Sequence, residues 1–181
     1  FNIENGEFLK KQNRPTYGEI IGKQLCEYAK GNNGNLLRVI CPAMALGTGI
    51  ESFQKDFSNQ FIDIGIAEEN GAVMASSMAI MGLKPVYFVY ATFLQRAYDE
   101  IIHDIARINA HVVFCVDHAG LVPTDGDTHQ GIYDLAMYSS IPGLTILNPN
   151  SIVDAEEMIK FALDELTGPV IIRYPKGEVL F

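Results

Sequence analysis

The fold is decided by the stretch Phe61-Ile62-Asp63-Ile64-Gly65-Ile66-Ala67-Glu68-Glu69-Asn70. Its first half is typical of a buried strand, Gly65 favours a turn, and the carboxylates that follow favour the start of a helix. Gly71–Met81 is so apolar that we expect this helix to be largely buried. A helix directly after a strand places Glu68 at the strand's carboxyl end, where ligands of α/β proteins bind. We therefore expect Glu68 to face a half-dry crevice.

Five other short runs resemble this strand, because they are rich in Val and Ile and mostly lack alternation of apolar and polar residues. Strands buried on both faces of a parallel sheet have this composition. The six predicted strands are Leu37–Cys41, Phe61–Ile64, Pro85–Tyr90, His111–Val116, Leu144–Leu147 and Val170–Tyr174. Amphipathic helices are predicted most clearly at Tyr17–Ala29, Thr92–Asn109 and Ile152–Leu166. This alternation predicts an α/β fold, a single three-layer domain with a mainly parallel six-stranded sheet.

The composition excludes several classes of protein. The chain has 181 residues, of which 48% are hydrophobic and 19% charged, which suits one folded domain and excludes disorder. Its apolar runs fall well short of the roughly 20 residues that cross a bilayer, so we expect no membrane span. The net charge of −9 argues against nucleic acid as a partner, since phosphate binding needs a basic face.

The cysteines, the histidines and the first residue give three further expectations. Cys26, Cys41 and Cys115 are odd in number and lie in apolar runs, which indicates reduced core thiols of a cytoplasmic protein. The four histidines lack the spacing of metal ligands, so we expect no metal bound by this chain alone. The sequence begins at Phe1 without an initiator Met, which suggests a piece of a longer protein.

Two motifs at predicted strand ends carry side chains suited to chemistry. In Tyr90-Ala91-Thr92-Phe93-Leu94-Gln95-Arg96-Ala97-Tyr98-Asp99, Phe93 and Arg96 lie one helical turn apart. Phe93 could stack on a flat heterocycle while Arg96 pairs with an anion. The alternative is that Phe93 belongs to the core and Arg96 is a solvated charge. The stretch from Asp117 to Gly131 holds two histidines and three aspartates, which could bind substrate hydroxyls and move protons, or could be an ordinary polar loop.

Two further predicted strand ends carry glycines or cations. Gly47-Thr48-Gly49 matches neither a dinucleotide fingerprint nor a phosphate-binding loop, so we interpret it as a plain turn between strand and helix. Arg173-Tyr174-Pro175-Lys176-Gly177 leaves the last predicted strand with two cations. They could bind a phosphate, or could cap a surface edge.

Together these segments resemble the 1-deoxy-D-xylulose-5-phosphate synthases, a family within the transketolase superfamily of thiamin diphosphate enzymes. The resemblance runs from about Thr16 to Gly177. It includes Pro42-Ala43-Met44, Gly65-Ile66-Ala67-Glu68, Thr92-Phe93-Leu94-Gln95-Arg96-Ala97-Tyr98-Asp99, Asp125-Gly126, Thr128-His129-Gln130-Gly131 and Arg173-Tyr174-Pro175. It implies a thiamin diphosphate-binding fold, with the pyrimidine-binding domain at residues 16–177, an N-terminal linker at 1–15 and the start of a second linker at 178–181.

The resemblance also implies the roles of the residues that would meet the cofactor. Glu68 takes the place of the catalytic glutamate that hydrogen-bonds a ring nitrogen of the aminopyrimidine. Ile66 and Phe93 would form apolar walls around the ring, and Arg96 would lie beside it.

A second set of residues matches family positions that line the substrate pocket, where pyruvate and an aldose phosphate meet. Arg173 would bind the phosphate, and His129 would be a catalytic proton donor or a ligand of a hydroxyl group. Tyr90, His118 and Asp125 would complete the substrate-binding set. Two residues depart from the family pattern, in which an Arg is usual at position 118 and a His at the position of Asn70. These departures concern the identity of the acceptor more than the use of the cofactor.

The family's diphosphate site is missing from this sequence. Members hold the diphosphate through Mg²⁺ on a G-D-G motif with a downstream Asn, and Asp125-Gly126-Asp127 is not that motif. The resemblance therefore implies that thiamin diphosphate and Mg²⁺ also need a diphosphate-binding domain of the same or a partner chain. We expect a homodimer, an exposed apolar face where partners bind, and no turnover by this chain alone.

Three functions stay open at this point. The first is the central domain of an enzyme that condenses pyruvate with glyceraldehyde 3-phosphate with loss of CO₂, a step towards isoprenoid precursors. The second is half of a transketolase, or the beta subunit of a 2-oxoacid dehydrogenase. The third is a noncatalytic α/β interaction module.

Overall fold

The sheet has six strands in the order β2-β1-β3-β4-β6-β5, and every neighbouring pair is parallel. The structure, a computed structural model, describes residues 14–123 and 125–179. The strands are β1 (Leu37–Cys41), β2 (Phe61–Asp63), β3 (Lys84–Tyr90), β4 (Val113–Asp117), β5 (Thr145–Leu147) and β6 (Val170–Arg173). The predicted α/β class is confirmed, and the sheet is wholly parallel in the described part of the chain.

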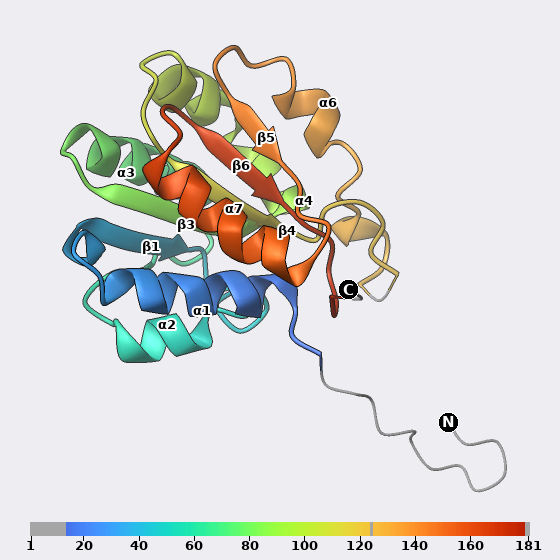
Figure 1. Cartoon of the computed structure of the whole chain (residues 1–181). Helices are drawn as coiled ribbons and strands as arrows, with labels where there is room; N and C mark the ends of the chain where they lie inside the picture. Colours follow the sequence, from blue (N-terminus) through green and yellow to red (C-terminus); the bar gives the residue numbers. More distant parts are fainter. Residues whose placement is uncertain (1–13, 124, 180–181) are drawn as a thin grey trace, which may run out of the picture.

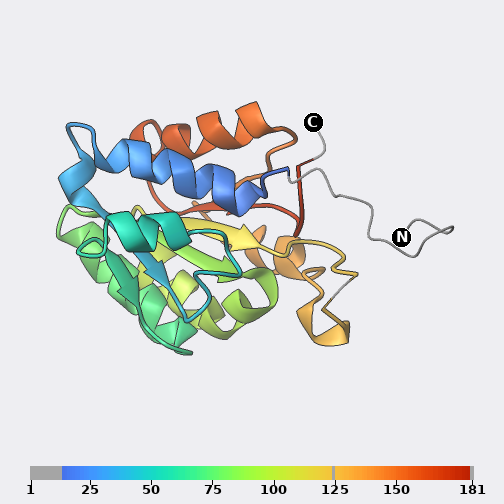
Figure 2. The same cartoon turned by 90° about the horizontal axis from the view of Figure 1, so that it is seen from below.

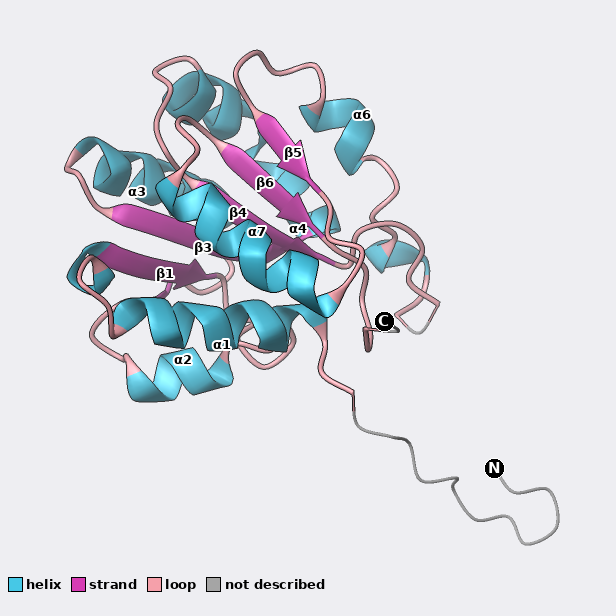
Figure 3. Cartoon of the chain, viewed as in Figure 1, coloured by secondary structure: helices cyan, strands magenta, loops and turns pink. Residues whose placement is uncertain are grey.

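Helices cover both faces of the sheet, so the domain has three layers (Figure 1, Figure 3). The α-helical segments are α1 (Tyr17–Ala29), α2 (Glu51–Asp56), α3 (Glu68–Ile80), α4 (Ala91–Leu94), α5 (Tyr98–Glu100), α6 (Asp134–Tyr138) and α7 (Ile152–Asp164). The short turns are η1 (Gly34–Leu36), η2 (Gln95–Ala97), η3 (Ile101–Ala106) and η4 (Asp127–His129). One apolar core lies between the sheet and α1, α2 and α7, and a second lies between the sheet and the layer of α3 to η3 and α6 (Figure 2).

Helix α1 begins and ends where the sequence predicts, because its cap and its apolar stripe agree. The Thr16 hydroxyl accepts the backbone N–H of Glu19, and the Glu19 carboxylate accepts the backbone N–H of Thr16 at 2.7 Å, which is a capping box. Ile21 and Leu25 follow one helical turn apart and are fully buried. Each such side chain stabilises the fold by about 1.5–3 kcal/mol relative to exposure.

The predicted helix at Thr92–Asn109 is interrupted in the structure. It starts at Ala91 as α4, tightens into the 3₁₀ turn η2 and widens into the π-helical segment η3. Ala97 has φ −96° and ψ 21°, outside the α-helical region, so the α-helical hydrogen-bond pattern breaks there. Asp104 in the wide segment accepts a hydrogen bond from the Ser76 hydroxyl of α3 through its backbone carbonyl. The prediction of a single continuous helix is therefore wrong.

Helix α3 is less buried than its composition suggests. It starts at Glu68 and buries Ala72 and Ala75, yet Val73 is 42% exposed and Ile80 is 66% exposed. The prediction of a largely buried helix is wrong for this outer side, because apolar residues surround the helix whereas the sheet covers only one side of it. The expected exposed apolar face is present here.

The two ends of the described chain lie side by side. The backbone N–H of Val179 donates to the carbonyl of Pro15 at 3.1 Å, and Thr16 forms an isolated antiparallel bridge with Glu178. Of the linkers predicted at residues 1–15 and 178–181, residues 1–13 and 180–181 lie outside the described part of the chain.

The cysteines and the helix lengths agree with the expectations from composition. Cys26, Cys41 and Cys115 are all free and buried, as predicted. Among the described residues, no helix is both long and apolar enough to span a membrane.

Candidate active site

The predicted site residues lie at or beyond the carboxyl ends of β2, β3, β4 and β6. The chain passes from β1 outward to β2 and then returns to place β3 on the other side of β1, so the strand order reverses between β1 and β3. Ligands of open α/β sheets bind beside such a reversal. Tyr90 ends β3, and its hydroxyl lies against Gly47 in the loop that follows β1.

Three contacts place Glu68 at this edge. Gly65 turns the chain between β2 and α3 with φ +65°, a left-handed conformation that glycine adopts without strain. The Asp63 carboxylate accepts the backbone N–H of Gly65 at 2.9 Å and that of Ala43 at 3.0 Å, which fixes the turn. The Tyr87 hydroxyl donates to the backbone carbonyl of Glu68 at 3.0 Å and anchors the first turn of α3.

The Glu68 side chain is enclosed and ion-paired. The residue is 1% exposed, and Nη1 of Arg96 donates to its Oε1 at 2.7 Å. Within the described residues, Oε2 of Glu68 makes no hydrogen bond. The predicted burial of Glu68 is confirmed, and the carboxylate keeps one oxygen available to a ligand.

Arg96 and Phe93 contact one another as their spacing predicts. The guanidinium carbon of Arg96 lies 5.2 Å from the centroid of the Phe93 ring. The 3₁₀ turn η2 carries Arg96 towards Glu68, so the interrupted helix has a consequence for the site. Ile66 lies two residues before Glu68, in the turn between β2 and α3, and is 82% exposed. An exposed aliphatic side chain, a half-buried aromatic ring and a buried carboxylate fit one side of a flat, polar-edged heterocycle such as an aminopyrimidine.

Four rings form a continuous group beside this carboxylate. Tyr90 stacks on His118 with centroids 3.8 Å apart and on Phe93 with centroids 5.5 Å apart. The edge of His129 meets Phe93, with 5.3 Å between centroids. Burial, followed by the charges of Asp117 and Asp125, raises the pKa of Tyr90 to about 12, so its hydroxyl is a hydrogen-bond donor at neutral pH.

His118 is held between two carboxylates. It is 2% exposed; its Nδ1 lies 3.0 Å from Oδ1 of Asp117, and its Nε2 lies 3.1 Å from Oδ2 of Asp125. Lys176 donates to the same Asp125 oxygen at 2.6 Å. Asp125 thus lies next to the ring group, as predicted, while both ring nitrogens of His118 already face protein atoms.

Arg173 lies at the end of β6 and is held by its own partners. Its Nε donates to Oδ2 of Asp134 at 2.7 Å, its Nη2 to Oδ1 of Asp134 at 3.3 Å, and its Nη1 to Oδ1 of Asn148 at 2.8 Å. Asp134 is 4% exposed, so this bidentate pair fixes the plane of the guanidinium. The two remaining N–H groups of Arg173 lie outside these contacts.

Several residues that build the site are not singled out by the sequence analysis. Asp134 and Tyr87 belong to no recognised motif, because each acts through a contact distant in sequence. Lys176 is noticed as a cation, but its contact with Asp125 depends on how the loop after β4 folds back. Gly47 does more than form a turn, since a Cβ atom there would lie 1.9 Å from the Tyr90 hydroxyl.

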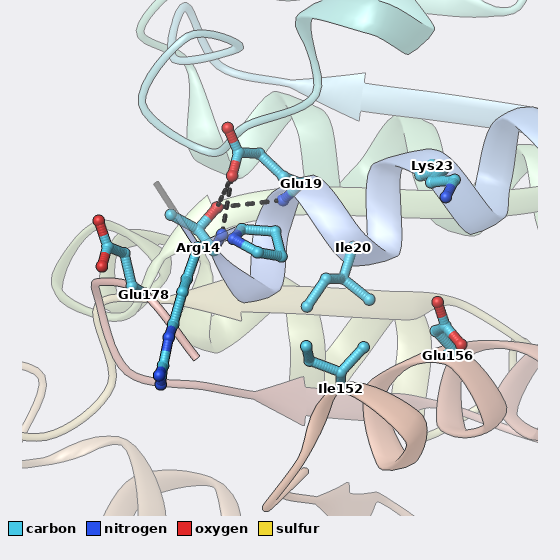
Figure 4. A pocket seen from close by; sticks show the side chains of 9 residues that line it. Arg14, Glu19, Ile20, Lys23, Ile152, Glu156 and Glu178 are labelled. Atoms are coloured by element: carbon cyan, nitrogen blue, oxygen red, sulfur yellow. Dashed lines mark hydrogen bonds between the residues drawn. The ribbon is translucent and has the colours of Figure 1, made fainter. Parts of the chain in front are cut away.

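A hollow of about 730 Å³ lies elsewhere, beside the first turns of α1 and α7. Arg14, Glu19, Lys23, Glu156 and Glu178 line it together with Ile20 and Ile152 (Figure 4). None of the predicted site residues is among its lining residues, so it is separate from the group around Glu68. Within residues 14–123 and 125–179 there is no cluster of three or more His, Cys, Asp or Glu side chains suited to a metal ion.

Comparisons with known proteins identify the family to which this chain belongs. The family model "Transketolase, pyrimidine binding domain" matches residues 13–180. The 1-deoxy-D-xylulose-5-phosphate synthase of Lachnoclostridium phytofermentans is 46% identical over 177 residues, which are 98% of this chain and 28% of that protein. The synthase of Lysinibacillus sphaericus is 41% identical over 179 residues, again 98% of this chain and 28% of that protein. The chain thus spans little more than a quarter of the length of these relatives.

Solved structures show the same fold. A split-gene transketolase, described as an inactive beta4 tetramer, has a TM-score of 0.77 and 29% identity over 89% of this chain and 51% of that one. The transketolase of Campylobacter jejuni has a TM-score of 0.81 at 18% identity, over 93% of this chain and 27% of that one. By its sequence match and its fold, the chain belongs to the family of transketolase pyrimidine-binding domains.

Proposed function

We propose that this chain supplies the pyrimidine-binding half of a thiamin diphosphate site in an enzyme that condenses pyruvate with glyceraldehyde 3-phosphate and releases CO₂. The observation that carries the proposal is Glu68, a buried carboxylate at the carboxyl edge of the sheet with one oxygen paired to Arg96 and the other available. The similarity to 1-deoxy-D-xylulose-5-phosphate synthases over 98% of the chain supports the choice of substrates.

Glu68 and the residues around it would each make a different contact with the cofactor. Thiamin diphosphate, when bound, supplies a thiazolium carbon that adds to a 2-oxo acid and takes up the electron pair left when CO₂ departs. Glu68 would hydrogen-bond a ring nitrogen of the aminopyrimidine through Oε2, while Arg96 fixes the carboxylate through Oε1. Ile66 and Phe93 would form apolar walls that exclude water from the ring.

The residues beyond the ring group would bind the substrates. Tyr90, a donor at neutral pH, and Asp125 would bind hydroxyl or carbonyl oxygens. His129 would donate a proton or bind a hydroxyl, since its ring edge borders Phe93. Arg173 would bind the acceptor phosphate through the N–H groups that Asp134 and Asn148 leave available.

The remainder of the site would come from outside this chain. We place Mg²⁺ and the diphosphate on a diphosphate-binding domain of the same or a partner protein in the cytoplasm, and we propose a homodimer. The exposed apolar side chains Ile66, Ile80 and Met81 support a covering partner, because each is at least 66% exposed. The isolated chain is expected to give no acetoin or 1-deoxy-D-xylulose 5-phosphate from pyruvate, and measurable product from it would contradict a divided site.

A transketolase half is a second candidate, favoured by the 29% identity to the split-gene transketolase. The two functions differ in the donor substrate, since a transketolase uses a ketose phosphate and releases no CO₂.

The experiment that separates them uses the enzyme that contains this chain together with its diphosphate-binding domain. CO₂ release from pyruvate is measured with and without glyceraldehyde 3-phosphate, and ketose phosphate consumption is measured in parallel. Acceptor-stimulated CO₂ release is the expected result. Ketose phosphate turnover without CO₂ release would replace the first function by the second.

A further inference from the structure

His118 has no surface left with which to contact a substrate. The residue is 2% exposed, its ring face is covered by Tyr90 at 3.8 Å, and both of its nitrogens face carboxylates. Asp117 presents a carboxylate oxygen to Nδ1 and Asp125 presents one to Nε2, so neither ring nitrogen is directed at open space. A substrate anion could reach the ring only by displacing Asp125 or Tyr90.

The backbone at His118 is arranged to keep the ring in this place. Its φ of +59° is left-handed, which is uncommon for a residue other than glycine. The Asp117 carboxylate accepts the backbone N–H of His118 as well as facing Nδ1. The next residue, Ala119, donates its N–H to the carbonyl of Tyr174 at 3.0 Å, so the end of β4 is fixed on both sides of the ring.

Beyond His118 the chain forms what we call the site loop, residues 120–123 and 125–131 as described. Gly120 and Gly131 close its base with two backbone hydrogen bonds of 2.8 Å. The Gln130 side chain accepts the N–H of Val122 at 2.9 Å and donates to the carbonyl of Val122 at 2.8 Å. The outer part of the loop is tied to the domain through Asp125, which contacts His118 from inside and Lys176 from the solvent side.

We propose that His118 is a positioning residue, a clamp that holds the site loop through Asp125 and supports the Tyr90 ring, and that it does not contact the acceptor. The clamp stands on the contacts above. Its effect on the acceptor rests on the proposed function, because Asp125, Tyr90 and His129 would be displaced together when the clamp is lost. In this arrangement Arg173, a cation at this edge, keeps N–H groups for the phosphate.

Two substitutions of His118 test its contacts with Asp117 and with Asp125 separately. His118→Asn keeps a donor near the position of Nδ1 for Asp117 but is too short to reach Asp125, and Asn tolerates the left-handed backbone. His118→Gln keeps a donor near the position of Nε2 for Asp125. Lys176→Met is the matched control, because it removes a second contact to Asp125 from a lysine whose side chain is 36% exposed.

The first measurement needs no turnover. Amide hydrogen exchange of Gly120, Val122 and Gly131 is followed in the full 181-residue chain. We expect His118→Asn to raise the exchange rates of these three amides at least tenfold, His118→Gln and Lys176→Met to change them less than threefold, and amides of β1 and β3 to keep their rates. Unchanged rates in His118→Asn, or an equal effect of Lys176→Met, would overturn the clamp.

The second measurement uses the enzyme that contains this chain. We expect His118→Asn to raise the KM for the aldose phosphate at least tenfold and to leave the KM for pyruvate within twofold, with recovery in His118→Gln. A raised acceptor KM without faster amide exchange would show direct contact and overturn the proposal. An enzyme with no pyruvate activity in the wild type would refute the proposed function, while the exchange measurement would still decide the clamp.

Discussion

Gly47 determines where the Tyr90 ring can lie. A Cβ atom at Gly47 would be 1.9 Å from the Tyr90 hydroxyl oxygen and 3.1 Å from the ring carbon that bears it. Gly47 is not among the residues with positive φ, so alanine suits its backbone and the effect of Gly47→Ala comes from this contact. The ring would have to move, and its stack on His118 at 3.8 Å would be lost.

We predict that Gly47→Ala lowers the free energy of unfolding by about 1–3 kcal/mol, the usual cost of overpacking. Tyr90→Phe removes the oxygen that collides, so Gly47→Ala with Tyr90→Phe should be more stable than Gly47→Ala alone. Recovery should be partial, because the ring carbon at 3.1 Å still limits the space. Urea unfolding of the four proteins measures the coupling, and purely additive effects would contradict this contact.

At the residue scale, the sequence identifies the groups of the site but not their pairing. Phe93 and Arg96 are adjacent through their spacing of one helical turn, which the sequence predicts, whereas Arg96 pairs with Glu68 across 28 residues of sequence. The pairing of Arg173 with Asp134 joins residues 39 apart in sequence, and no local spacing encodes it. For His118 as well, the sequence predicts the position at the end of β4 but not the burial, because the burial depends on contacts with the loop that follows.

At the scale of elements, three segments are joined by one lysine at the amino-terminal edge of the sheet. Lys84 begins β3, and its Nζ lies 2.7 Å from Oδ1 of Asp164 at the end of α7 and 2.8 Å from the hydroxyl of Tyr28 in α1. The Tyr28 hydroxyl donates to the same Asp164 oxygen at 2.7 Å. This contact ties both helices of one layer to the sheet.

The pKa values of this network set a window of pH. Burial by itself would raise the pKa of Asp164, but hydrogen bonds from Lys84 and Tyr28 outweigh burial and lower it. Burial would likewise lower the pKa of Lys84, and the bonds to Asp164 and Tyr28 outweigh it and raise it. The contribution of Asp164 is therefore present above its unfolded pKa of about 4 and is lost as pH falls through its folded pKa. The contribution of Lys84 is lost only as pH rises through a value above about 10.

We predict that Asp164→Asn lowers the free energy of unfolding by about 1 kcal/mol at pH 7, because solvent screens a carboxylate whose side chain is 43% exposed. The difference from wild type should shrink as the pH falls below about 4 and through the lowered folded pKa of Asp164. Denaturant unfolding at pH 3, 5 and 7 measures it. Glu165→Gln, at the exposed neighbouring position, is the control. An equal loss of unfolding free energy in that variant would show that the contacts of Asp164 with Lys84 and Tyr28 are not the cause.

Among the elements, patterns predict the long ones and miss the short ones. Leu37–Cys41 and Tyr17–Ala29 agree with the structure residue for residue, since burial on both faces and a capping box leave few alternatives. Helices α2 and α6 have 6 and 5 residues, too few to show a helical period, and were not predicted. The break at Ala97 was also missed, because contacts with α3 and not local propensity shape that segment.

At the scale of the whole molecule, the outer side of α3 is an exposed apolar surface. Val73 and Ile80 lie seven residues apart on this side and are 42% and 66% exposed. Sequence composition predicts burial of these residues, and the domain alone does not provide it. A second copy of the chain, or the rest of the enzyme, would cover them.

We predict that the chain self-associates and that Val73→Lys with Ile80→Lys abolishes the association. Sedimentation equilibrium between about 1 and 100 μM measures the dissociation constant, a range that spans weak dimers. Val153→Lys is the control, because Val153 is 58% exposed on α7 at the opposite layer. A wild-type chain that stays monomeric over this range would contradict association through α3. So would a Val153→Lys variant that loses the association as fully as the double variant does.

Exchange of the cofactor's thiazolium C2 proton with deuterium tests the proposed activation of thiamin diphosphate by Glu68. It is measured on the cofactor-loaded enzyme that contains this chain, in wild type, Glu68→Gln and Glu69→Gln. Glu69 is the exposed neighbour in the same turn of α3, so its variant controls for charge and helix stability. We expect exchange to slow by about 10²–10⁴-fold in Glu68→Gln, the usual contribution of a general acid–base group, and by less than threefold in Glu69→Gln. Wild-type exchange rates in Glu68→Gln with cofactor bound would contradict the claim.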